Sequence, residues 1–316
     1  MVSIGIDLGG TNIAAGIVDE AGNILASGSV RTLPQRPYQD VVKDMADISL
    51  HTLRKLNLSQ SDVRSVGIGI PGVADQGTGE VIFCTNLGWH NVPLRDEMQK
   101  YINKPVYIDN DANVAALAES IAGVSAGTQT SVFLTLGTGV GAGIMINGQL
   151  WNGCHGVAAE IGHLTLVADG EPCTCGKSGC LERYCSATAL GRMGRQALAE
   201  HPDSMLQAMS GGQPERVNAK TVLDAAKAGD AAAMAVFRHY VKYLSLAVNT
   251  IISFIDPEIV VLGGGVSKAG DFLADAVRAE IPHYLMYKTL PYAGIEIAGL
   301  GSDAGIIGAA MLGRKE

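Results

Sequence analysis

Three cysteines and one histidine lie close enough along the chain to bind a metal ion. Cys173, Cys175 and Cys180 fall within eight residues, and His163 precedes the first of them by ten. Three thiolates and one imidazole form a complete tetrahedral set for zinc, and a site filled by four protein ligands is typical of structural rather than catalytic zinc. The pattern therefore predicts a structural zinc site.

Buried thiols and a disulfide are the two alternatives to metal binding. Free cysteines are usually scattered apolar fillers, whereas half of the chain's six cysteines stand in this short stretch. Cys84, Cys154 and Cys185 show no paired framework, and Met1 leads directly into the strand-like run 2–6 rather than a signal peptide. We therefore expect a cytoplasmic protein, in which clustered cysteines more often bind metal than form disulfides.

Two acidic residues and two glycines frame the cysteine cluster. Glu160 and Glu182 bracket it in sequence, and Gly176 and Gly179 allow the chain to fold back sharply between the cysteines. Metal ligands packed this tightly beside acidic groups indicate a zinc knuckle that shapes a polar site.

A second group of polar residues stands where a predicted strand meets a predicted helix. Residues 108–113 read Ile-Asp-Asn-Asp-Ala-Asn, and such junctions expose functional groups in α/β sheets. Asn110 or Asp111 could serve only as a helix N-cap, although the run holds more polar residues than one cap requires. A carboxylate here could accept the proton of a substrate hydroxyl while Asn110 orients a neighbouring hydroxyl, and phosphoryl transfer with Mg2+ requires such a base.

Three glycine-rich loops could hold phosphates or a nucleotide. Asp7–Asn12 and Gly137–Gly143 each join two predicted strands and contain a threonine, and Gly263–Gly265 lies between a predicted strand and a helix. Backbone N–H groups without side chains around them can approach phosphate oxygens, and a bare backbone can lie against a planar adenine. A tight hairpin or a flexible turn would explain each loop alone, but the first two occupy equivalent places in two halves of the chain.

Other nucleotide-binding motifs are not expected. The P-loop pattern G-x-x-x-x-G-K-[ST] does not occur in the sequence. Residues 67–72 match G-x-G-x-x-G, but Pro71 stands where a helix should start. We therefore interpret this match as accidental.

The elements that must position these residues repeat along the chain. Each half opens with a strand, a glycine-rich turn, a second strand and a hairpin, which predicts an α/β fold with two similar lobes and a central cleft. The predicted strands are residues 2–6, 13–18, 24–30, 66–70, 106–108, 131–136, 142–146, 259–262 and 295–298. The predicted helices are residues 38–56, 112–122, 219–229, 230–255 and 271–281, and a final helix, capped by Ser302 or Asp303, that ends at about Leu312.

Composition and charge exclude several classes of function. The chain has 316 residues, 47% of them apolar and 17% charged, with a net charge of −8. An acidic chain with two tryptophans and five phenylalanines is unsuited to a nucleic-acid surface. No apolar run reaches the roughly 18 residues of a membrane span. The apolar helix near Val241–Ile255 fits either the core or an interface.

Together these motifs resemble the ROK sugar kinases, a family with the actin/hexokinase-like ATPase fold. The resemblance runs over essentially the whole chain. It is carried, in the family's order and spacing, by Asp7–Thr11, Asn110-Asp111, Gly137–Gly143, Glu160-x-Gly162-His163, Cys173-x-Cys175-Gly176-x-x-Gly179-Cys180-x-Glu182 and Gly263–Gly265. Within the family, the run Cys180–Thr188 is most similar to the bacterial ATP-dependent glucokinases. The resemblance implies ATP-dependent phosphorylation of the 6-hydroxyl of a hexose. Glucose is the expected substrate, and N-acetylmannosamine, N-acetylglucosamine, fructose and allose are the alternatives.

The resemblance also implies a role for each motif residue. Asp111 would be the general base, and Asp7 would lie near Mg2+. Sugar hydroxyls would be bound by Gly72, Asn86, Asn110, Asp111, Glu160, His163 and Glu182. The phosphates of ATP would be held by Gly9, Gly10, Thr11, Asn12, Thr138 and Gly139, and its adenosine by Gly264 and Gly265. Zinc would take His163, Cys173, Cys175 and Cys180.

The double role of His163 is chemically consistent. One ring nitrogen can bind zinc while the other N–H donates to a sugar oxygen, and the metal then fixes the tautomer and the plane of the ring.

We also predict how the chain divides into two lobes. We expect a small lobe of residues 1–117 plus 300–316 and a large lobe of residues 118–299, with the zinc knuckle at about 160–182. The resemblance implies a homodimer and lobe closure that excludes water as a competing acceptor.

Related sugar-responsive repressors carry an N-terminal helix-turn-helix, for which a phosphate loop at Asp7 leaves no room. A non-catalytic sugar-binding protein is disfavoured by Asp111 and by both phosphate loops.

Overall fold

The computed structural model describes residues 1–314, and the chain forms two compact units. Unit 1 comprises Met1–Gln129, Gly143–Ala158 and the segment from Gly299 onward. Unit 2 comprises Thr130–Ala142 and Ala159–Ala298.

These units differ from the predicted lobes at residues 118–129, at residues 143–158 and at Gly299, all of which belong to unit 1. A break after residue 117 would cut through α3 (Asp111–Ala122). Residues 143–158 belong to unit 1 because Gly143 packs on α3, where a Cβ would lie 2.5 Å from the Cβ of Ala116. The last two residues of the predicted small lobe, 315–316, lie outside the described part of the chain.

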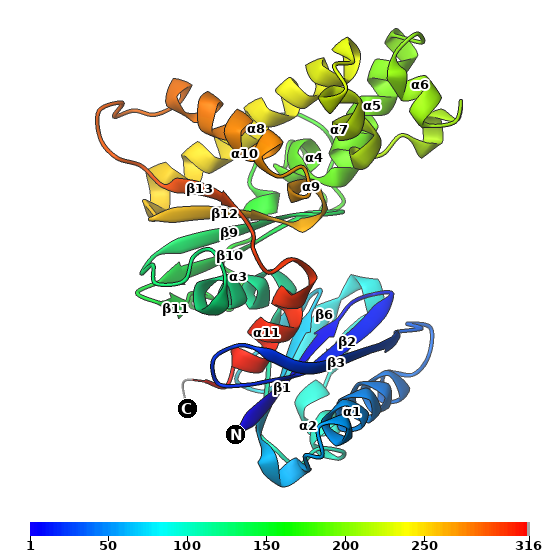
Figure 1. Cartoon of the computed structure of the whole chain (residues 1–316), viewed down its shortest axis with the longest axis vertical. Helices are drawn as coiled ribbons and strands as arrows, with labels where there is room; N and C mark the ends of the chain where they lie inside the picture. The colour runs from blue at the N-terminus through cyan, green and yellow to red at the C-terminus, as the bar shows by residue number, and fades with distance from the viewer. Residues whose placement is uncertain (315–316) are drawn as a thin grey trace. The chain divides into compact units, whose positions relative to one another are not determined.

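Unit 1 is built on a five-stranded sheet with the strand order β3-β2-β1-β4-β8. Figure 1 labels its first three strands along the chain, β1, β2 and β3. Hairpins join β1, β2 and β3, while β4 and β8 run parallel to β1. The register sets Asp7, Gly69 and Asp109 side by side near the carboxyl ends of the parallel strands. All five predicted strands are present, as β1 (Val2–Leu8), β2 (Asn12–Val18), β3 (Ile24–Arg31), β4 (Val63–Ile70) and β8 (Val106–Asn110).

Alternation along β1 separates the two faces of this sheet. The apolar face packs on α1 (Tyr38–Lys55) with the fully buried Ile4, Ile6 and Leu8. The glycine face packs on α11 (Ala304–Met311), since a Cβ at Gly5 or Gly67 would lie only 1.9 or 1.7 Å from a carbonyl oxygen of that helix. The match at residues 67–72 therefore contributes to helix packing, and the strand β5 (Val73–Asp75), not a helix, follows it.

The sequence does not predict a second, three-stranded sheet in unit 1. β5 (Val73–Asp75), β6 (Glu80–Cys84) and β7 (Trp89–Val92) form an antiparallel meander, and α2 (Leu94–Gln99) follows it. A three-residue strand that begins directly after Pro71-Gly72 is too short to show a period-two pattern.

The second five-stranded sheet has the order β11-β10-β9-β12-β13, which matches the first position by position. β9 pairs in parallel with β12, and β12 with β13, while β10 and β11 form a hairpin. This repetition confirms the predicted duplication of an α/β plan. The strands are β9 (Ser131–Leu136), β10 (Val140–Ile146), β11 (Gln149–Leu150), β12 (Ile259–Gly263) and β13 (Gly294–Ile297).

The helices of unit 2 include three that the sequence predicts and four that it does not, of which only α5 (Ala187–Glu200) is long. The predicted ones are α7 (Ala219–Lys227), α8 (Ala231–Ile255) and α10 (Asp271–Glu280). Glycines interrupt the pattern of α5, where a Cβ at Gly194 would lie 2.3 Å from Val222 of α7, so these glycines permit close helix packing. The remaining helices are α4 (Glu182–Cys185), α5 (Ala187–Glu200), α6 (Met205–Met209) and α9 (Gly264–Ser267).

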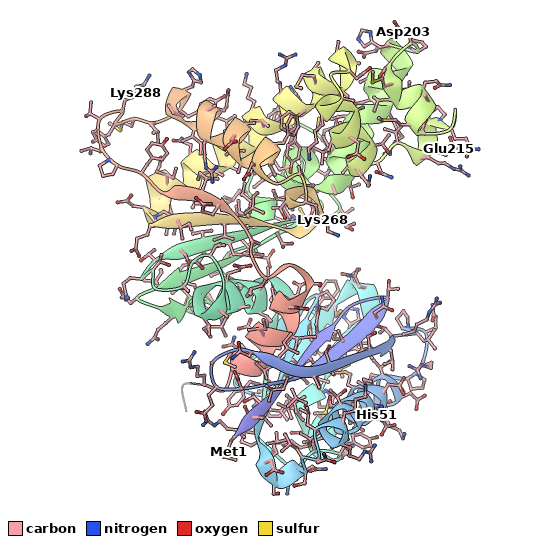
Figure 2. The ribbon with its side chains drawn as sticks, in the orientation of Figure 1. Met1, His51, Asp203, Glu215, Lys268 and Lys288 are labelled. Carbon is pink, nitrogen blue, oxygen red and sulfur yellow. The ribbon has the colours of Figure 1, made fainter. Side chains whose placement is uncertain are left out.

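The side chains of both units are drawn in Figure 2, with His51 on α1 and Lys268 directly after α9. Among the helices within residues 1–314, α8 included, none has the length and apolar character that a membrane span requires. Short 3-10 turns are η1 (Gln60–Asp62), η2 (Thr85–Leu87), η3 (Ile161–His163), η4 (Pro214–Arg216), η5 (Ile281–His283) and η6 (Gly301–Asp303).

The predicted N-cap position of the final helix is confirmed at Asp303, but the expected side-chain capping bond is not formed within residues 1–314. Asp303 occupies the N-cap position of α11, but its side chain makes no capping bond to any described residue. An N-cap residue is normally extended so that its side chain can turn back to the helix. Asp303 is instead in the helical region (φ −82°, ψ −16°), because the 3-10 turn η6 leads straight into α11.

Candidate active site and metal centre

The corner between β8 and α3 carries the predicted base. Asn110 is the N-cap of α3, and its Oδ1 accepts a bond of 2.9 Å from the backbone N–H of Ala112. Its Nδ2 donates to the carbonyl of Gly72 at 3.1 Å, so two predicted sugar-binding residues are joined. Asp111 is exposed at the first position of the helix. Asn110 therefore caps the helix, and Asp111 is accessible, as a base that must reach a substrate has to be.

Sequence reasoning assigns no role to the residue just before this corner. Asp109 is 4% exposed, and its carboxylate accepts hydrogen bonds from three side-chain amides and one backbone N–H. Burial raises the pKa of this carboxyl, and the hydrogen bonds partly oppose that shift. A signal exists in the sequence, namely a second acidic residue beside Asp111 in the run 108–113, but the partners of Asp109 are distant along the chain.

The first of the predicted phosphate loops is a tight turn between β1 and β2. The N–H of Gly9 donates to the carbonyl of Asn12 at 2.9 Å, and the hydroxyl of Thr32 donates to the carbonyl of Gly9 at 2.6 Å. Thr11 and Asn12 are exposed. A Cβ at Gly10 would lie 3.3 Å from the Cβ of Asn86, so the loop lies against η2, which carries a predicted sugar ligand.

Asp7 precedes this loop at the carboxyl end of β1. Its carboxyl group contacts the start of α11, where a Cβ at Gly305 would lie 2.6 Å from Asp7 Oδ2. Burial raises the pKa of Asp7. In the absence of a cation, burial favours the neutral form of such a carboxyl. A nearby cation would stabilise the ionised form, so this carboxyl is suited to a position beside a metal ion.

The corresponding loop in unit 2 is held by the segment that follows the cysteines. The N–H of Ala187 donates to the carbonyl of Gly137 and the hydroxyl of Thr188 to that of Thr138, both at 2.7 Å. The N–H of Val140 donates to Glu182 Oε2 at 3.0 Å. The predicted sugar ligand Glu182 is thus in direct contact with the predicted phosphate loop, and sequence reasoning missed Thr188 as a loop partner.

The third glycine run follows β12 and begins α9. Gly264 has φ +81°, and a Cβ there would lie 2.6 Å from the backbone N of Leu136. Gly265 has no atom of residues 1–314 within 4 Å of its ideal Cβ position and is exposed. Glycine is therefore required at 264 by geometry, whereas Gly265 presents the bare backbone expected to face an adenosine.

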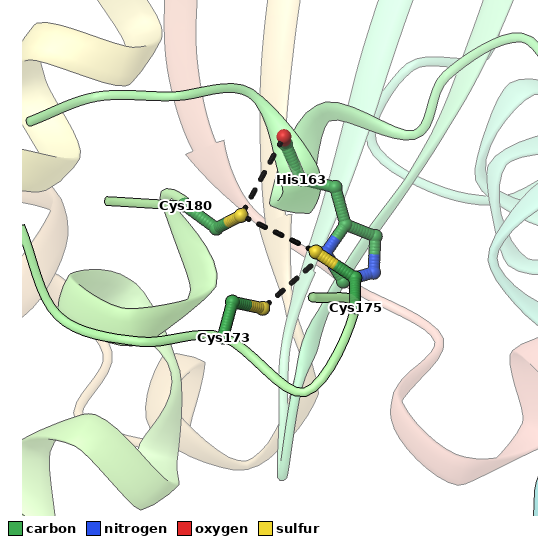
Figure 3. Close-up of side chains that lie close together, drawn as sticks. All are labelled: His163, Cys173, Cys175 and Cys180. Carbon is green, nitrogen blue, oxygen red and sulfur yellow. Dashed lines mark hydrogen bonds between the residues drawn. The ribbon is translucent and has the colours of Figure 1, made fainter. Parts of the chain in front are cut away.

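The structure brings His163, Cys173, Cys175 and Cys180 together (Figure 3), with one ligand atom from each within 4.8 Å of the others. The Sγ atoms of Cys175 and Cys180 are 3.6 Å apart, and Cys173 Sγ is 3.7 Å from His163 Nδ1. Tetrahedral zinc with Zn–S bonds of ~2.3 Å and Zn–N bonds of ~2.0 Å holds such pairs about 3.5 to 3.8 Å apart. The four residues therefore fit a structural zinc ion, ligated through His163 Nδ1.

Close backbone contacts shape this knuckle. A Cβ at Gly162 would lie 2.0 Å from the carbonyl oxygen of Val140, and one at Gly179, which has φ +78°, would lie 1.6 Å from that of Val167. Lys177 Nζ donates to the carbonyl of His163 at 2.7 Å. Burial raises the pKa of the Cys180 thiol to about 12, so a metal cation would be needed to keep all three sulfurs ionised together.

The predicted site residues thus divide between the units. Unit 1 carries Asp7, Gly9, Gly10, Thr11, Asn12, Gly72, Asn86, Asn110 and Asp111. Unit 2 carries Thr138, Gly139, Glu160, His163, Cys173, Cys175, Cys180, Glu182, Gly264 and Gly265. Glu160 is exposed at the start of η3, and His163 ends that turn.

A family model described as the ROK family matches residues 3–316. The chain belongs to the ROK family. It is 38% identical to a glucokinase of Halalkalibacterium halodurans over 314 residues, which covers 99% of this chain and 95% of that protein. A glucokinase of Thermotoga maritima is also 38% identical, over 98% of this chain and 96% of the relative.

A solved ROK structure has the same fold. The structure of a ROK family glucokinase from Streptomyces griseus, in complex with glucose and AMPPNP, superposes with a TM-score of 0.86 at 35% identity and covers all of both chains. This likeness confirms the predicted hexokinase-like α/β fold.

Proposed function

We propose that this ROK family protein is a glucokinase that transfers the γ-phosphoryl group of ATP to the 6-hydroxyl of glucose. One observation carries the proposal: the chain aligns almost end to end with glucokinases at 36–38% identity. The exposed Asp111 beside a helix N-cap supplies the carboxylate that this chemistry needs.

In the proposed mechanism, Asp111 accepts the proton of the 6-hydroxyl as the hydroxyl oxygen attacks the γ-phosphorus and the bond from that phosphorus to the leaving ADP breaks. Asn110, joined to Gly72, orients the sugar from the same corner, and Asn86 adds a further contact. Phosphoryl transfer depends chiefly on positioning and on stabilising charge at the phosphate oxygens. The loops at Gly9–Asn12 and Thr138-Gly139 supply backbone donors for this purpose, and Gly264-Gly265 lies against the adenosine.

Glu160, His163 and Glu182 are proposed as the sugar ligands of unit 2. Zinc would supply a fixed anchor for His163, whose Nδ1 faces Cys173 and whose Nε2 can then donate to a sugar hydroxyl. Asp7 would lie near the Mg2+ that accompanies ATP, which supplies charge neutralisation at the phosphates. A cytoplasmic location fits a knuckle whose cysteines must stay reduced, and a homodimer remains part of the proposal.

A coupled ADP-release assay tests the proposal. Purified protein with Mg·ATP is given glucose, fructose, allose, mannose, N-acetylglucosamine and N-acetylmannosamine in parallel, and kcat/KM is compared. Glucose is expected to give the highest value. Higher kcat/KM with another sugar would transfer the proposal to that sugar's kinase, and no ADP release with any sugar would refute kinase activity.

A further inference from the structure

The carboxylate of Asp109 collects four donors at the back of the corner that carries Asp111. Its Oδ1 accepts from the backbone N–H of Asn110 at 2.7 Å and from Asn113 Nδ2 at 2.8 Å. Its Oδ2 accepts from Gln76 Nε2 at 2.5 Å and from Asn152 Nδ2 at 3.1 Å. The side chain is 4% exposed and has no cationic partner among these contacts. Four donors on one buried acceptor are a network in which each member constrains the others.

The donors come from separate segments of unit 1. Gln76 lies in the turn between β5 and β6, Asn113 is on the first turn of α3, and Asn152 follows β11. Because neighbouring residues of a strand point to opposite faces, Asp109 faces away from the side on which Asn110 bonds to Gly72. Asn110 and Asp109 therefore tie the same corner to the segment 72–76 from two sides.

A triangle of bonds makes this network sensitive to charge. Asn113 Nδ2 donates both to Asp109 and to Asn152 Oδ1, the latter at 3.1 Å, while Asn152 donates to Asp109. An amide at 109 would turn one acceptor into a donor, and Asn152 could not flip to receive it without facing Asn113 donor to donor. Asn113 Oδ1 has no hydrogen-bond partner in the part of the chain that the structure describes. Turning it toward residue 109 would set it against the amide oxygen that must still accept from the backbone N–H of Asn110.

We propose that Asp109 is a positioning residue for phosphoryl transfer, which holds the Asn110–Asp111 corner in its reactive orientation through Asn113, Asn152 and Gln76. This inference rests on the proposed kinase function and goes beyond it, because Asp109 touches neither substrate nor nucleotide in that proposal. The base is the exposed Asp111, and Asp109 sets where its backbone lies. A small displacement of a reacting group can cost about a hundredfold in rate.

A charge-swap cycle tests the inference. Asp109→Asn is expected to lower kcat for glucose by about ten- to a hundredfold and to change the KM for ATP by less than about twofold. Asn152→Asp sets two carboxylates against each other and is expected to be impaired as well. The double variant Asp109→Asn/Asn152→Asp again places one acid among amides, and most of the kcat is expected to return.

Stability separates positioning from a merely structural role. Burial favours the neutral form of Asp109, so loss of its charge offsets part of the cost of the mismatched amide, and the melting temperature of Asp109→Asn is expected to stay near that of wild type. Unchanged kcat in Asp109→Asn would overturn the inference. So would a double variant no more active than Asp109→Asn, or an activity loss that follows the melting temperature alone. An inactive wild type would instead refute the kinase proposal.

Discussion

The candidate site residues of unit 1 and those of unit 2 are held in place by different means. In unit 1, Asn110 and Asp111 stand where a central strand becomes a helix, and hydrogen bonds among carboxylates and amides fix the corner. In unit 2, Glu160, His163 and Glu182 stand in or beside irregular chain, where three sulfurs and one imidazole lie close enough for a zinc ion to tie the segment together.

This difference shows what a site requires when regular structure is absent. A strand–helix corner inherits its geometry from the sheet and needs only a network behind it. A loop with few backbone hydrogen bonds loses conformational entropy on folding without much compensation. A structural metal ion can stabilise the ordered conformation of such a loop. We therefore expect unit 1 variants to lose chemistry while keeping stability, and knuckle variants to lose both.

The largest loss of activity without a loss of stability is expected at Asp111. Asp111→Asn removes the proton acceptor but keeps the size of the side chain, and kcat is expected to fall at least ~100-fold, with ATP affinity and melting temperature near wild type. Steady-state kinetics and nucleotide binding by calorimetry measure both. Retention of more than about a tenth of wild-type kcat would exclude Asp111 as the base.

The knuckle should respond in the opposite way. Cys175→Ser removes one metal ligand and is expected to destabilise the protein by at least ~2 kcal/mol, a melting shift of roughly 4–8 °C, and to raise the KM for glucose. Cys154→Ser, which changes an exposed cysteine outside the cluster, is the matched control and should change neither. Metal analysis should give one zinc per chain in the control and less in Cys175→Ser. A Cys175→Ser protein with wild-type KM and melting temperature would defeat the metal's role.

The contrast also explains what the sequence could predict. The glycine loops, the cysteine spacing and the run at Asn110-Asp111 are local patterns, so their types, order and elements follow from residues near one another. The contacts of Asp109 do not, because Gln76 and Asn152 stand 33 and 43 residues from it. The same holds for Thr188, which bonds to Thr138 from 50 residues away. Helix α5 was hidden because Gly191 and Gly194 serve packing against residues 217–222 rather than a periodic pattern.

A substitution at Asp7 tests whether this buried carboxylate lowers the stability of the folded protein while it supports activity. Burial raises its pKa above the usual value of 3.8, so the folded state binds the proton more tightly than the unfolded state. The resulting stability is complete below pH 3.8 and is lost as pH rises through the raised value. Asp7→Asn should therefore melt at or above the wild-type temperature at pH 7 to 8, while kinase activity falls and the required Mg2+ concentration rises. An Asp7→Asn protein with a lower melting temperature than wild type across that range would contradict this account.

The smallest expected effect concerns the bond that links the chain after the knuckle to the phosphate loop. Thr188→Val keeps the shape of the side chain but removes the hydroxyl that donates to Thr138 at 2.7 Å. One hydrogen bond contributes about 1 kcal/mol, so the KM for ATP is expected to rise at most about fivefold and the melting temperature to fall by no more than about 2–4 °C, with the KM for glucose nearly unchanged. Thr188→Ser keeps the donor and should restore ATP affinity. Thr250→Val removes a similar hydroxyl bond on α8, 2.9 Å from the carbonyl of Leu246, and should leave ATP affinity unchanged. If Thr188→Val changed the KM for glucose and not the KM for ATP, this account would be wrong. Thr188 would then support the proposed sugar ligands near the knuckle rather than the proposed phosphate loop at Thr138.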